Sequence, residues 1–270
     1  MDTEIAVVLG PGGPVGTAWL IGLAVGLRQA GVDLGAADLI VGTSAGAIVG
    51  ALLASGEDLE RLAVPRSAAA LAGGVRTDPG KLAEVFATLG DGELDRAEAL
   101  RRVGQLAIAA DTGSEDAAIA RMRSLLGTAH WPERPLLIPA VDAESGELVT
   151  WDRDGAASLP EAMAASTAFP ATAPPITIGG RRYIDGALRA GANVDLAAQA
   201  GVLIVAEPGA HVFGASSAPA GHRTVIRLAP DAAAVNAFGP DLSAYATWEP
   251  AYQAGLRQAP EAARAITIPL

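Results

Sequence analysis

Residues 39–53 read LIVGTSAGAIVGALL. A short β-branched run at 39–41 leads into the pattern Gly-x-Ser-x-Gly, and a stretch rich in Ala, Leu and Val follows without proline. This order predicts a strand, a sharp turn and a helix. Gly42 and Gly46 let the strand and the helix pass closely, because neither carries a Cβ atom. Such a turn places Ser44 at the carboxyl edge of a sheet beside the first amides of a helix, where it is a candidate nucleophile.

An equivalent unit precedes this one. Residues 5–9 read IAVVL, a continuously apolar run typical of a central strand covered on both faces. Residues 10–16 predict a loop, and residues 17–30 have a helical spacing that ends at Gly31. Two successive strand–loop–helix units indicate an α/β fold with a mainly parallel sheet and right-handed crossovers.

The composition limits the functional class. The chain has 270 residues, of which half are apolar, no cysteine and a formal net charge of −11. The charge argues against nucleic acid and against standing attachment to anionic bilayers, while transient contact with a membrane surface stays open. The lack of cysteine excludes disulfides, thiol catalysis and zinc sites built on Cys. No repeat or low-complexity linker is present, so residues 1–270 are expected to form a single domain, whose oligomeric state stays open.

Neither targeting nor membrane insertion is predicted. Asp2 and Glu4 precede the first apolar run without a basic leader, so we expect no signal peptide and a cytoplasmic protein. Two uncharged stretches, 5–27 and 39–56, have the length of a membrane span. Glycines interrupt both stretches, and we interpret each as a buried strand followed by a buried helix.

The middle of the chain predicts a helical insertion beside the sheet. From residue 57 to about 133 no strand pattern appears, and amphipathic helices are expected at 58–72, 79–89, 95–110 and 114–126. The insertion either shapes a substrate channel or contributes packing alone. Sheet signals then return, with strands expected at 135–141, 148–151, 176–178, 181–184, 202–206 and 224–228, and helices at 159–166, 194–200 and 242–264, the last broken near Pro250 and Pro260.

A serine hydroxyl becomes a useful nucleophile only when a base removes its proton. The chain offers the imidazoles of His130, His211 and His222, none of which lies in a segment of clearly predicted structure. Asp185 follows a predicted hairpin and precedes Gly186, which makes it the best-placed acid. Asp-Gly is also a favoured turn pair, so the sequence leaves a purely structural role for this aspartate open.

The loop at 10–16, GPGGPVG, lies between a predicted buried strand and a helix, so its amides can point at an anion. One candidate anion is the pyrophosphate of a dinucleotide, which requires an acid at the end of the second strand. Asp33 has the required separation but precedes that strand. The other candidate is the oxyanion of acyl transfer. Because the loop and Ser44 follow two strands of one parallel sheet, they share an edge, which favours the oxyanion.

Five segments in order resemble motifs of the patatin-like phospholipase family, over about residues 5–188. They are VVLGPGGPVG at 7–16 (the Gly-rich oxyanion loop), GTSAG at 42–46 (the nucleophile elbow), a strand-turn segment at 142–147, ASTAFP at 165–170 with Pro174 beyond it, and DGA at 185–187 (the Asp-Gly-Gly/Ala motif). The resemblance implies a three-layer α/β/α fold, a lipid or acyl-ester substrate and no cofactor.

By this resemblance, Ser44 and Asp185 form a catalytic dyad in place of a triad. Ser44 attacks an ester carbonyl, and Asp185 accepts its proton. The amides of Gly12 and Gly13 hold the oxyanion, and water then releases the fatty acid from the acyl-enzyme. No metal dependence is expected, because no His/carboxylate cluster has the spacing of metal ligands. The expected function is a serine lipid acyl hydrolase of the phospholipase or esterase type.

Two alternatives stay open. Pro14 removes an amide from the loop, and Val15 stands where the family usually has Arg or Lys. These departures motivate a non-catalytic lipid- or acyl-binding protein on the same scaffold. The other alternative is an α/β-hydrolase with a Ser–Asp–His triad that uses His211 or His222. That fold normally places several strands before its elbow, whereas one strand is predicted before this one.

Overall fold

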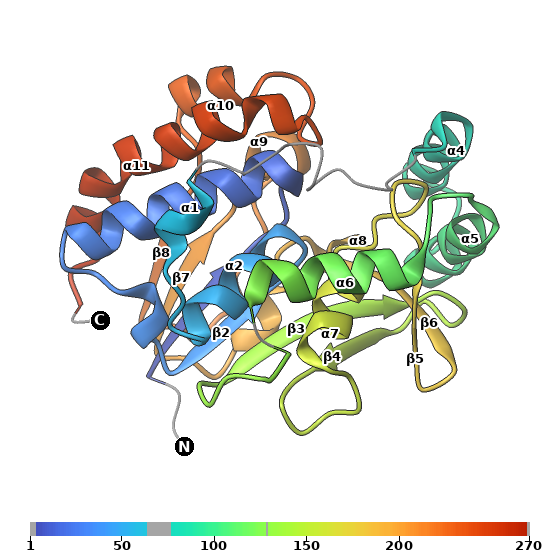
Figure 1. Ribbon diagram of the computed structural model, residues 1–270, viewed down its shortest axis with the longest axis horizontal. Helices are drawn as coiled ribbons and strands as arrows, with labels where there is room; N and C mark the ends of the chain where they lie inside the picture. Colours follow the sequence, from blue (N-terminus) through green and yellow to red (C-terminus); the bar gives the residue numbers. More distant parts are fainter. Residues whose placement is uncertain (1–3, 64–76, 128, 269–270) are drawn as a thin grey trace.

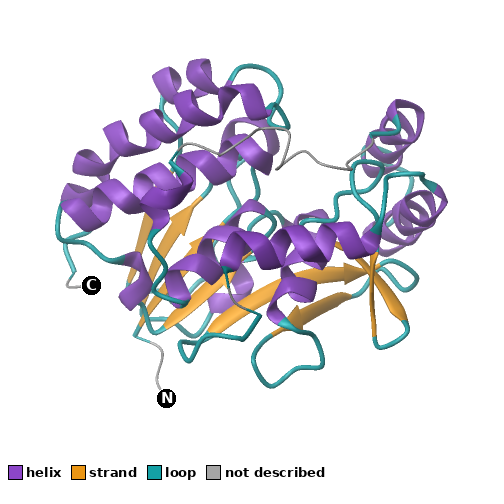
Figure 2. Cartoon of the chain, viewed as in Figure 1, coloured by secondary structure: helices purple, strands orange, loops and turns teal. Residues whose placement is uncertain are grey.

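A central sheet with helices on both sides forms the core of the structure, a computed structural model that describes residues 4–63, 77–127 and 129–268 (Figures 1 and 2). The strands are β1 (Ile5–Leu9), β2 (Leu39–Gly42), β3 (Leu136–Asp142), β4 (Leu148–Trp151), β5 (Ile176–Ile178), β6 (Arg181–Asp185), β7 (Val202–Ala206) and β8 (Thr224–Leu228). The α-helices are α1 (Gly13–Gln29), α2 (Ala45–Ala54), α4 (Pro79–Leu89), α5 (Arg96–Ala109), α6 (Glu115–Leu126), α7 (Leu159–Ser166), α8 (Ala187–Ala190), α9 (Ala210–Phe213), α10 (Ala232–Phe238) and α11 (Trp248–Ala265). Short 3-10 turns are η1 (Leu34–Ala36), η2 (Leu59–Leu62), η3 (Val194–Ala197) and η4 (Tyr245–Thr247).

The strands follow the order β5-β6-β3-β2-β1-β7-β8, and β4 also pairs with β3. The pairs β1–β2, β1–β7, β2–β3 and β7–β8 are parallel. The pairs β3–β4, β3–β6 and β5–β6 are antiparallel. The predicted α/β class, with a mainly parallel sheet between helices, is therefore confirmed. Each predicted strand forms within one residue of its expected bounds.

Strands β2 and β6 bring two distant parts of the chain together beside β3. Strand β2 runs parallel to β3 and pairs Val41 with Leu137. Strand β6 runs antiparallel to β3 and pairs Asp185 with Ala140. The carboxyl ends of β2 and β6 therefore approach each other along β3. The residues just after β2 and the last residue of β6 meet at this point.

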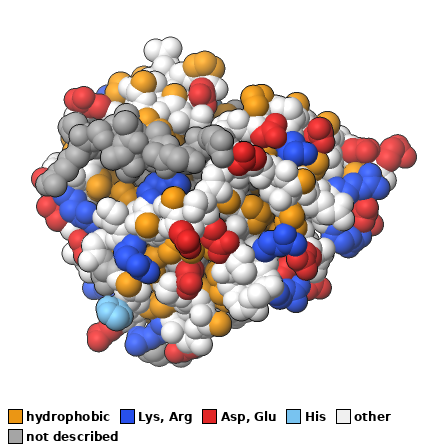
Figure 3. All heavy atoms as spheres, turned by 45° about the vertical axis from the view of Figure 1, so that its right-hand side comes forward, with side chains coloured by type: hydrophobic (Ala, Val, Ile, Leu, Met, Phe, Trp, Pro, Cys, Tyr) orange, Lys and Arg blue, Asp and Glu red, His pale blue; other side chains and the backbone are white. Residues whose placement is uncertain are grey.

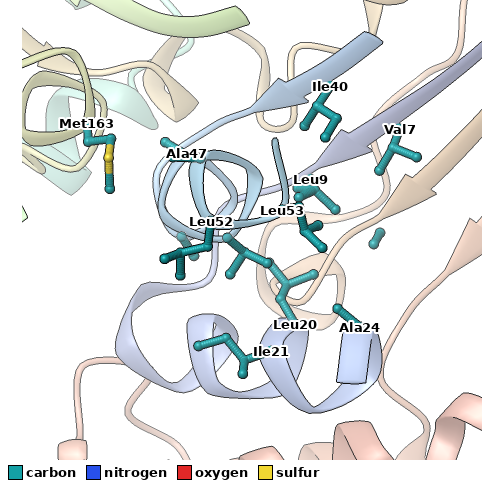
Figure 4. Packing of buried hydrophobic residues seen from close by; sticks show 14 of the residues in the cluster. Val7, Leu9, Leu20, Ile21, Ala24, Ile40, Ala47, Leu52, Leu53 and Met163 are labelled. Atoms are coloured by element: carbon teal, nitrogen blue, oxygen red, sulfur yellow. The ribbon is translucent and has the colours of Figure 1, made fainter. Parts of the chain in front are cut away.

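Both faces of β1, β2 and β7 are buried, as the apolar run at 5–9 predicts for β1. On one face helix α2 lies between the strands and α1, and its Leu53 packs near Leu9 of β1 (Figure 4). The other face is covered by η3 and the residues that flank it, from Ala192 to Ala200. The buried residues of this second face are Ala6, Val8, Val41, Ala192, Val194, Ala197, Ala200, Leu203 and Val205.

Helix α11 runs along α1 and contacts it at backbone distance (Figure 1). A Cβ atom at Gly22 would lie 2.0 Å from the Tyr252 carbonyl oxygen, and one at Gly255 would lie 2.1 Å from the Trp19 carbonyl oxygen. The Trp19 indole N–H also donates a hydrogen bond to Gln258 Oε1 at 2.8 Å. The two helices are therefore interlocked, and α11 belongs to the core.

The structure corrects several helix bounds. Helix α1 begins at Gly13 and not at residue 17, because Pro14 fits the first turn, where no helical N–H bond is needed. Helix α11 starts at Trp248 and continues through Pro260, because its packing against α1 outweighs the hydrogen bond that proline removes. The helix expected at 194–200 is only the turn η3, since the chain must then turn into β7.

Other expectations concern the insertion and the membrane. Helices α4, α5 and α6 form where they were predicted. The helix expected at 58–72 is represented by η2, and its residues 64–72 lie outside the described residues. The two uncharged stretches form β1 with α1 and β2 with α2, as interpreted. Across the part of the chain that the structure describes, no helix combines the length and apolar character needed to cross a bilayer.

The contact between α1 and α11 can be tested with Gly255→Ala. The added Cβ overlaps the Trp19 carbonyl oxygen, so the helices must separate, and the free energy of unfolding should fall by about 2 kcal/mol. Gly80→Ala is the control, because a Cβ there would meet nothing closer than 3.5 Å. Urea denaturation measures both variants. Equal unfolding free energies for the two would contradict the interlocked packing.

Candidate active site

Ser44 lies in a strained turn between β2 and α2. Its backbone has φ 55° and ψ −115°, a region that residues other than glycine rarely occupy. A Cβ atom at Gly46 would lie 1.9 Å from the Leu9 carbonyl oxygen, and one at Gly42 would lie 2.4 Å from the Gly46 carbonyl oxygen. The turn therefore requires glycine on both sides of the serine, as the pattern Gly-x-Ser-x-Gly predicts.

Asp185 meets Ser44 from the end of β6. The Ser44 hydroxyl donates a hydrogen bond to Asp185 Oδ2 at 2.7 Å, although the two residues are 141 positions apart in the chain. The other carboxylate oxygen, Oδ1, accepts the Ala187 N–H at 2.9 Å. Glycine is required at Gly186, because a Cβ there would lie 2.3 Å from the Pro139 carbonyl oxygen. The structure thus brings together the two side chains that the sequence singles out.

Burial dominates the electrostatics of this pair. The side chains are nearly inaccessible, with Asp185 2% and Ser44 8% exposed. Burial raises the pKa of Asp185 to about 7, and the hydrogen bonds from Ala187 and Ser44 offset only part of that rise. Because both protonation states are accessible near neutral pH, this carboxyl group can accept a proton and return it.

Helix α7 and the turn after it hold the backbone of both residues. The Ser166 hydroxyl oxygen accepts the Ser44 N–H at 3.0 Å. The Ala168 carbonyl oxygen accepts the Asp185 N–H, also at 3.0 Å. Both contacts come from the segment at 165–170, which the sequence connects to the site by family resemblance alone. No local sequence signal indicates them, because they depend on the packing of α7 against α2 and β6.

The Gly-rich loop continues into the first turn of α1, with Gly12 as the N-cap. The Val15 N–H donates to the Leu242 carbonyl oxygen at 3.2 Å. Gly13, at φ 59°, approaches the same oxygen so closely that a Cβ would lie 2.7 Å from it. Pro14 occupies the first helical turn, so its missing amide leaves no helical bond unmade. The contact with Leu242 therefore anchors the loop at Val15.

The four residues predicted for the site line one cavity. Ser44, Asp185, Gly12 and Gly13 all contribute to its wall. Within the described residues, neither the Gly12 nor the Gly13 amide donates a hydrogen bond to another protein group. Both amides stand at the N-terminal end of α1, where the helix dipole favours an anion. The arrangement leaves two backbone donors available beside the serine's cavity.

The cavity is large and mostly apolar, with a volume of about 950 Å³. Leu82 and Phe86 of α4 and Met122 and Leu125 of α6 form part of its wall. The segment before α11 contributes Leu242 from the other side. The helical insertion therefore forms part of the cavity wall as well as packing beside the sheet.

The three histidines lie outside the lining of this cavity. The His211 ring packs against the Phe238 ring at a centroid distance of 5.7 Å, and His222 Nδ1 lies 2.8 Å from the Ala200 carbonyl oxygen. His130 precedes β3 in a loop. In the described ranges of the chain, no three or more His, Cys, Asp or Glu side chains gather in a group that could hold a metal ion.

Comparisons with known proteins place this chain in a family. The model of the family described as patatin-like phospholipase matches residues 7–198. No curated protein sequence matches the chain significantly. Among solved structures, the crystal structure of VipD from Legionella pneumophila is similar, with 13% identity, a TM-score of 0.43 and coverage of 97% of this chain and 67% of that one. The type III effector protein ExoU is similar with 14% identity, a TM-score of 0.38 and coverage of 97% and 54%.

The raised pKa of Asp185 predicts a pH dependence of stability. The folded protein holds this proton more tightly than the unfolded chain, whose aspartate has a pKa of 3.8. The resulting stabilisation is complete below pH 3.8 and is lost as the pH rises through about 7. Between these values the unfolding free energy of the wild type should therefore fall relative to that of Asp185→Asn, as measured by denaturant titration.

Asp142→Asn is the control for this measurement. Burial acts to raise the pKa of Asp142, but the Arg181 guanidinium and the amides of Ser145 and Glu144 outweigh it and hold that pKa below its usual value. The contribution of Asp142 to the unfolding free energy therefore changes below pH 3.8 and stays constant between pH 3.8 and 7. Parallel pH profiles for wild type and Asp185→Asn would contradict the raised pKa.

Proposed function

The chain belongs to the patatin-like phospholipase family, and we propose that it is a serine lipid acyl hydrolase with a Ser44–Asp185 dyad. The observation that carries this proposal is the 2.7 Å hydrogen bond between the two side chains at the wall of a large cavity. Because residues from Pro11 to Trp248 line that cavity, we also propose that residues 1–270 act as one catalytic domain.

The proposed reaction has two halves. In the first, Ser44 Oγ attacks the ester carbonyl carbon while its proton passes to Asp185 Oδ2. The tetrahedral intermediate then expels the alcohol, which takes that proton from Asp185 and leaves an acyl group on Ser44. In the second half, Asp185 removes a proton from water as the water attacks the acyl-enzyme. The fatty acid leaves, and the proton returns to Ser44.

Two features lower the barrier in this scheme. The Gly12 and Gly13 amides stabilise the developing oxyanion, and one such donor contributes about 3 kcal/mol. A carboxyl group with a pKa of about 7 is also a better proton acceptor for a serine than one with the ordinary value of 3.8. Burial of Asp185 therefore supplies the basicity that a histidine provides in a triad.

The walls and the mouth of the cavity support a lipid substrate. Its volume and apolar lining fit an acyl chain. Phe86 and Phe213 line the cavity and are 53% and 55% exposed, so they mark its opening to solvent. Val212, beside Phe213, is 56% exposed. Among the described residues, four large hydrophobic side chains are exposed, and Phe86, Val212 and Phe213 are three of them. We propose that these three side chains make transient contact with a lipid surface.

The charge of the chain favours a neutral or zwitterionic lipid surface over an anionic one. The formal net charge is −11, which opposes approach to anionic headgroups. The face drawn in Figure 3 carries acidic and basic side chains close together, with hydrophobic side chains between them. Among the described residues on that face, no block of basic charge dominates.

Two observations favour the dyad over the two alternatives. The Leu242 carbonyl oxygen holds the loop through the Val15 N–H, and the first turn of α1 accommodates Pro14, which supports an intact loop. Among the described residues that line the cavity there is no histidine to complete a Ser–Asp–His triad. The dyad, the triad and the non-catalytic binding protein predict different responses to mutation.

The dyad can be tested by mutation of both of its members. Ser44→Ala and Asp185→Asn should each lower kcat for p-nitrophenyl esters roughly 10⁴-fold, and the double variant should be little worse, because the residues act as a unit. A fluorophosphonate probe should label the wild type and not Ser44→Ala. Near-additive losses in the double variant would contradict the dyad.

A variant without histidines serves as the control. Replacement of His130, His211 and His222 by Ala should leave kcat within about twofold of the wild type, since none of them lines the cavity. Loss of activity in this variant would support the triad. A wild type that neither hydrolyses p-nitrophenyl or phosphatidylcholine esters nor reacts with the probe would support the non-catalytic binding protein.

Contact with a lipid surface can be tested separately from catalysis. In a Ser44→Ala background, Val212→Ser with Phe213→Ser should lower the partition coefficient for phosphatidylcholine vesicles by about 10-fold or more, because two apolar side chains leave the interface. Cosedimentation measures the partition. Val225→Ser is the matched control, since Val225 is exposed on β8 but outside the cavity lining. Equal partition of the two variants would refute the proposed contact.

A further inference from the structure

A buried asparagine lies next to both halves of the proposed dyad. Asn193 has no exposed surface and sits at the start of η3 with φ 53°, in the left-handed region. It does not line the cavity, so it does not touch substrate. Leaving a polar side chain in the interior costs free energy unless it is hydrogen-bonded, and its partners indicate what it does.

The side-chain amide of Asn193 contacts the residues adjacent to the dyad. Its Nδ2 donates to Thr43 Oγ1 at 3.2 Å, and Thr43 directly precedes Ser44. The same nitrogen donates to the Gly186 carbonyl oxygen at 3.0 Å, and Gly186 directly follows Asp185. One amide group therefore connects the end of β2 with the end of β6.

Neighbouring groups fix the direction of this amide. Arg189 Nη1 donates to Asn193 Oδ1 at 3.3 Å and is itself paired with Asp195 at 2.8 Å. Because a guanidinium can only donate, it selects the oxygen side of the amide and turns the NH₂ group toward the dyad. Thr43 Oγ1 in turn donates to the Ala192 carbonyl oxygen at 3.2 Å, so its lone pairs remain available to Asn193.

The topology explains why such a connection matters. Strands β2 and β6 both pair with β3. The last paired residue of β2 lies opposite Leu137, and the last paired residue of β6 lies opposite Ala140. The two strands form no ladder with each other. Their relative position along β3 is therefore set by loops and side chains. A displacement of about 1 Å between reacting groups lowers a rate by about 100-fold.

We propose that Asn193 is a positioning residue that holds Ser44 and Asp185 in register by joining Thr43 to Gly186. This role rests on the proposed function, since it matters for catalysis only if the dyad is catalytic. The amide acts through the backbone on either side of the reacting groups. Its loss therefore affects the chemical step and leaves substrate binding in the cavity unchanged.

The first test is Asn193→Gly. Glycine accepts the left-handed backbone at this position, so the variant removes the side chain without adding backbone strain. We expect kcat for a p-nitrophenyl ester to fall about 10- to 100-fold, with KM unchanged. The rate of fluorophosphonate labelling of Ser44 should fall in parallel.

Val194→Ala is the matched control. Val194 is the next residue, equally buried, and packs in the apolar cluster on the same face without contacting the dyad. It should lower the melting temperature but leave kcat within about twofold of the wild type. Equal falls in kcat in the two variants, at a temperature where both are folded, would mean that Asn193 is structural only.

Thr43→Val tests the same link if Asn193→Gly does not fold. It keeps the side-chain shape and removes the oxygen that accepts from Asn193, so one of the two connections is lost. We expect kcat to fall about 10-fold, again with KM unchanged. Unchanged kcat in this variant and in any folded Asn193 variant would overturn the proposal.

Crystal structures of the variants separate this inference from the proposed function. In Asn193→Gly, or in Thr43→Val if the first does not fold, the distance from Ser44 Oγ to Asp185 Oδ2 should exceed hydrogen-bonding range, whereas Val194→Ala should keep it at 2.7 Å. A distance that stays at the wild-type value would refute positioning by Asn193, whether or not the enzyme hydrolyses esters. Absence of Ser44-dependent hydrolysis, with the distance changed as expected, would refute the proposed function alone.

Discussion

The hydrogen bond between Ser44 and Asp185 depends on a constraint of the sheet: two strands of opposite direction end at neighbouring positions along β3. Parallel pairing carries the chain after β2 to this point, and antiparallel pairing brings the last residue of β6 to it from the other direction. Neither strand alone would create a site. The mixed character of the sheet is therefore what allows a serine and a carboxyl group to face one another across 141 positions of sequence.

Two aspartates at this end of the sheet show how the surroundings assign different roles to the same side chain. Asp142 ends β3 and is buried, but its salt bridge with Arg181 at 2.6 Å and two turn amides hold its pKa below the usual value. Asp185 ends β6, and the groups that contact its carboxylate are a hydroxyl and one amide, so burial raises its pKa. The first is a permanent anion that shapes a turn, while the second can exchange a proton.

Local sequence signals predict much of the fold and part of the site. The elbow at Ser44, the Asp-Gly turn at Asp185 and the strand bounds follow from glycine spacing and apolar runs, which act over a few residues. The contacts of Ser166 and Asn193 could not be predicted, because each joins segments more than 120 positions apart. The start of α1 was missed because Pro14 fits its first turn, and the passage of α11 through Pro260 was missed because tertiary packing overrides local preference there.

The interlocking of α1 with α11 has a consequence for where the catalytic unit ends. The family model stops at residue 198, yet α11 clamps α1, and the Leu242 carbonyl restrains the turn that presents Gly12 and Gly13. A substitution in α11 that tilts α1 can therefore shift the Gly12 and Gly13 amides from a distance. A truncation at residue 198 would retain Ser44 and Asp185 in the chain, but it would remove β7, which pairs with β1, together with α11 and the Leu242 contact.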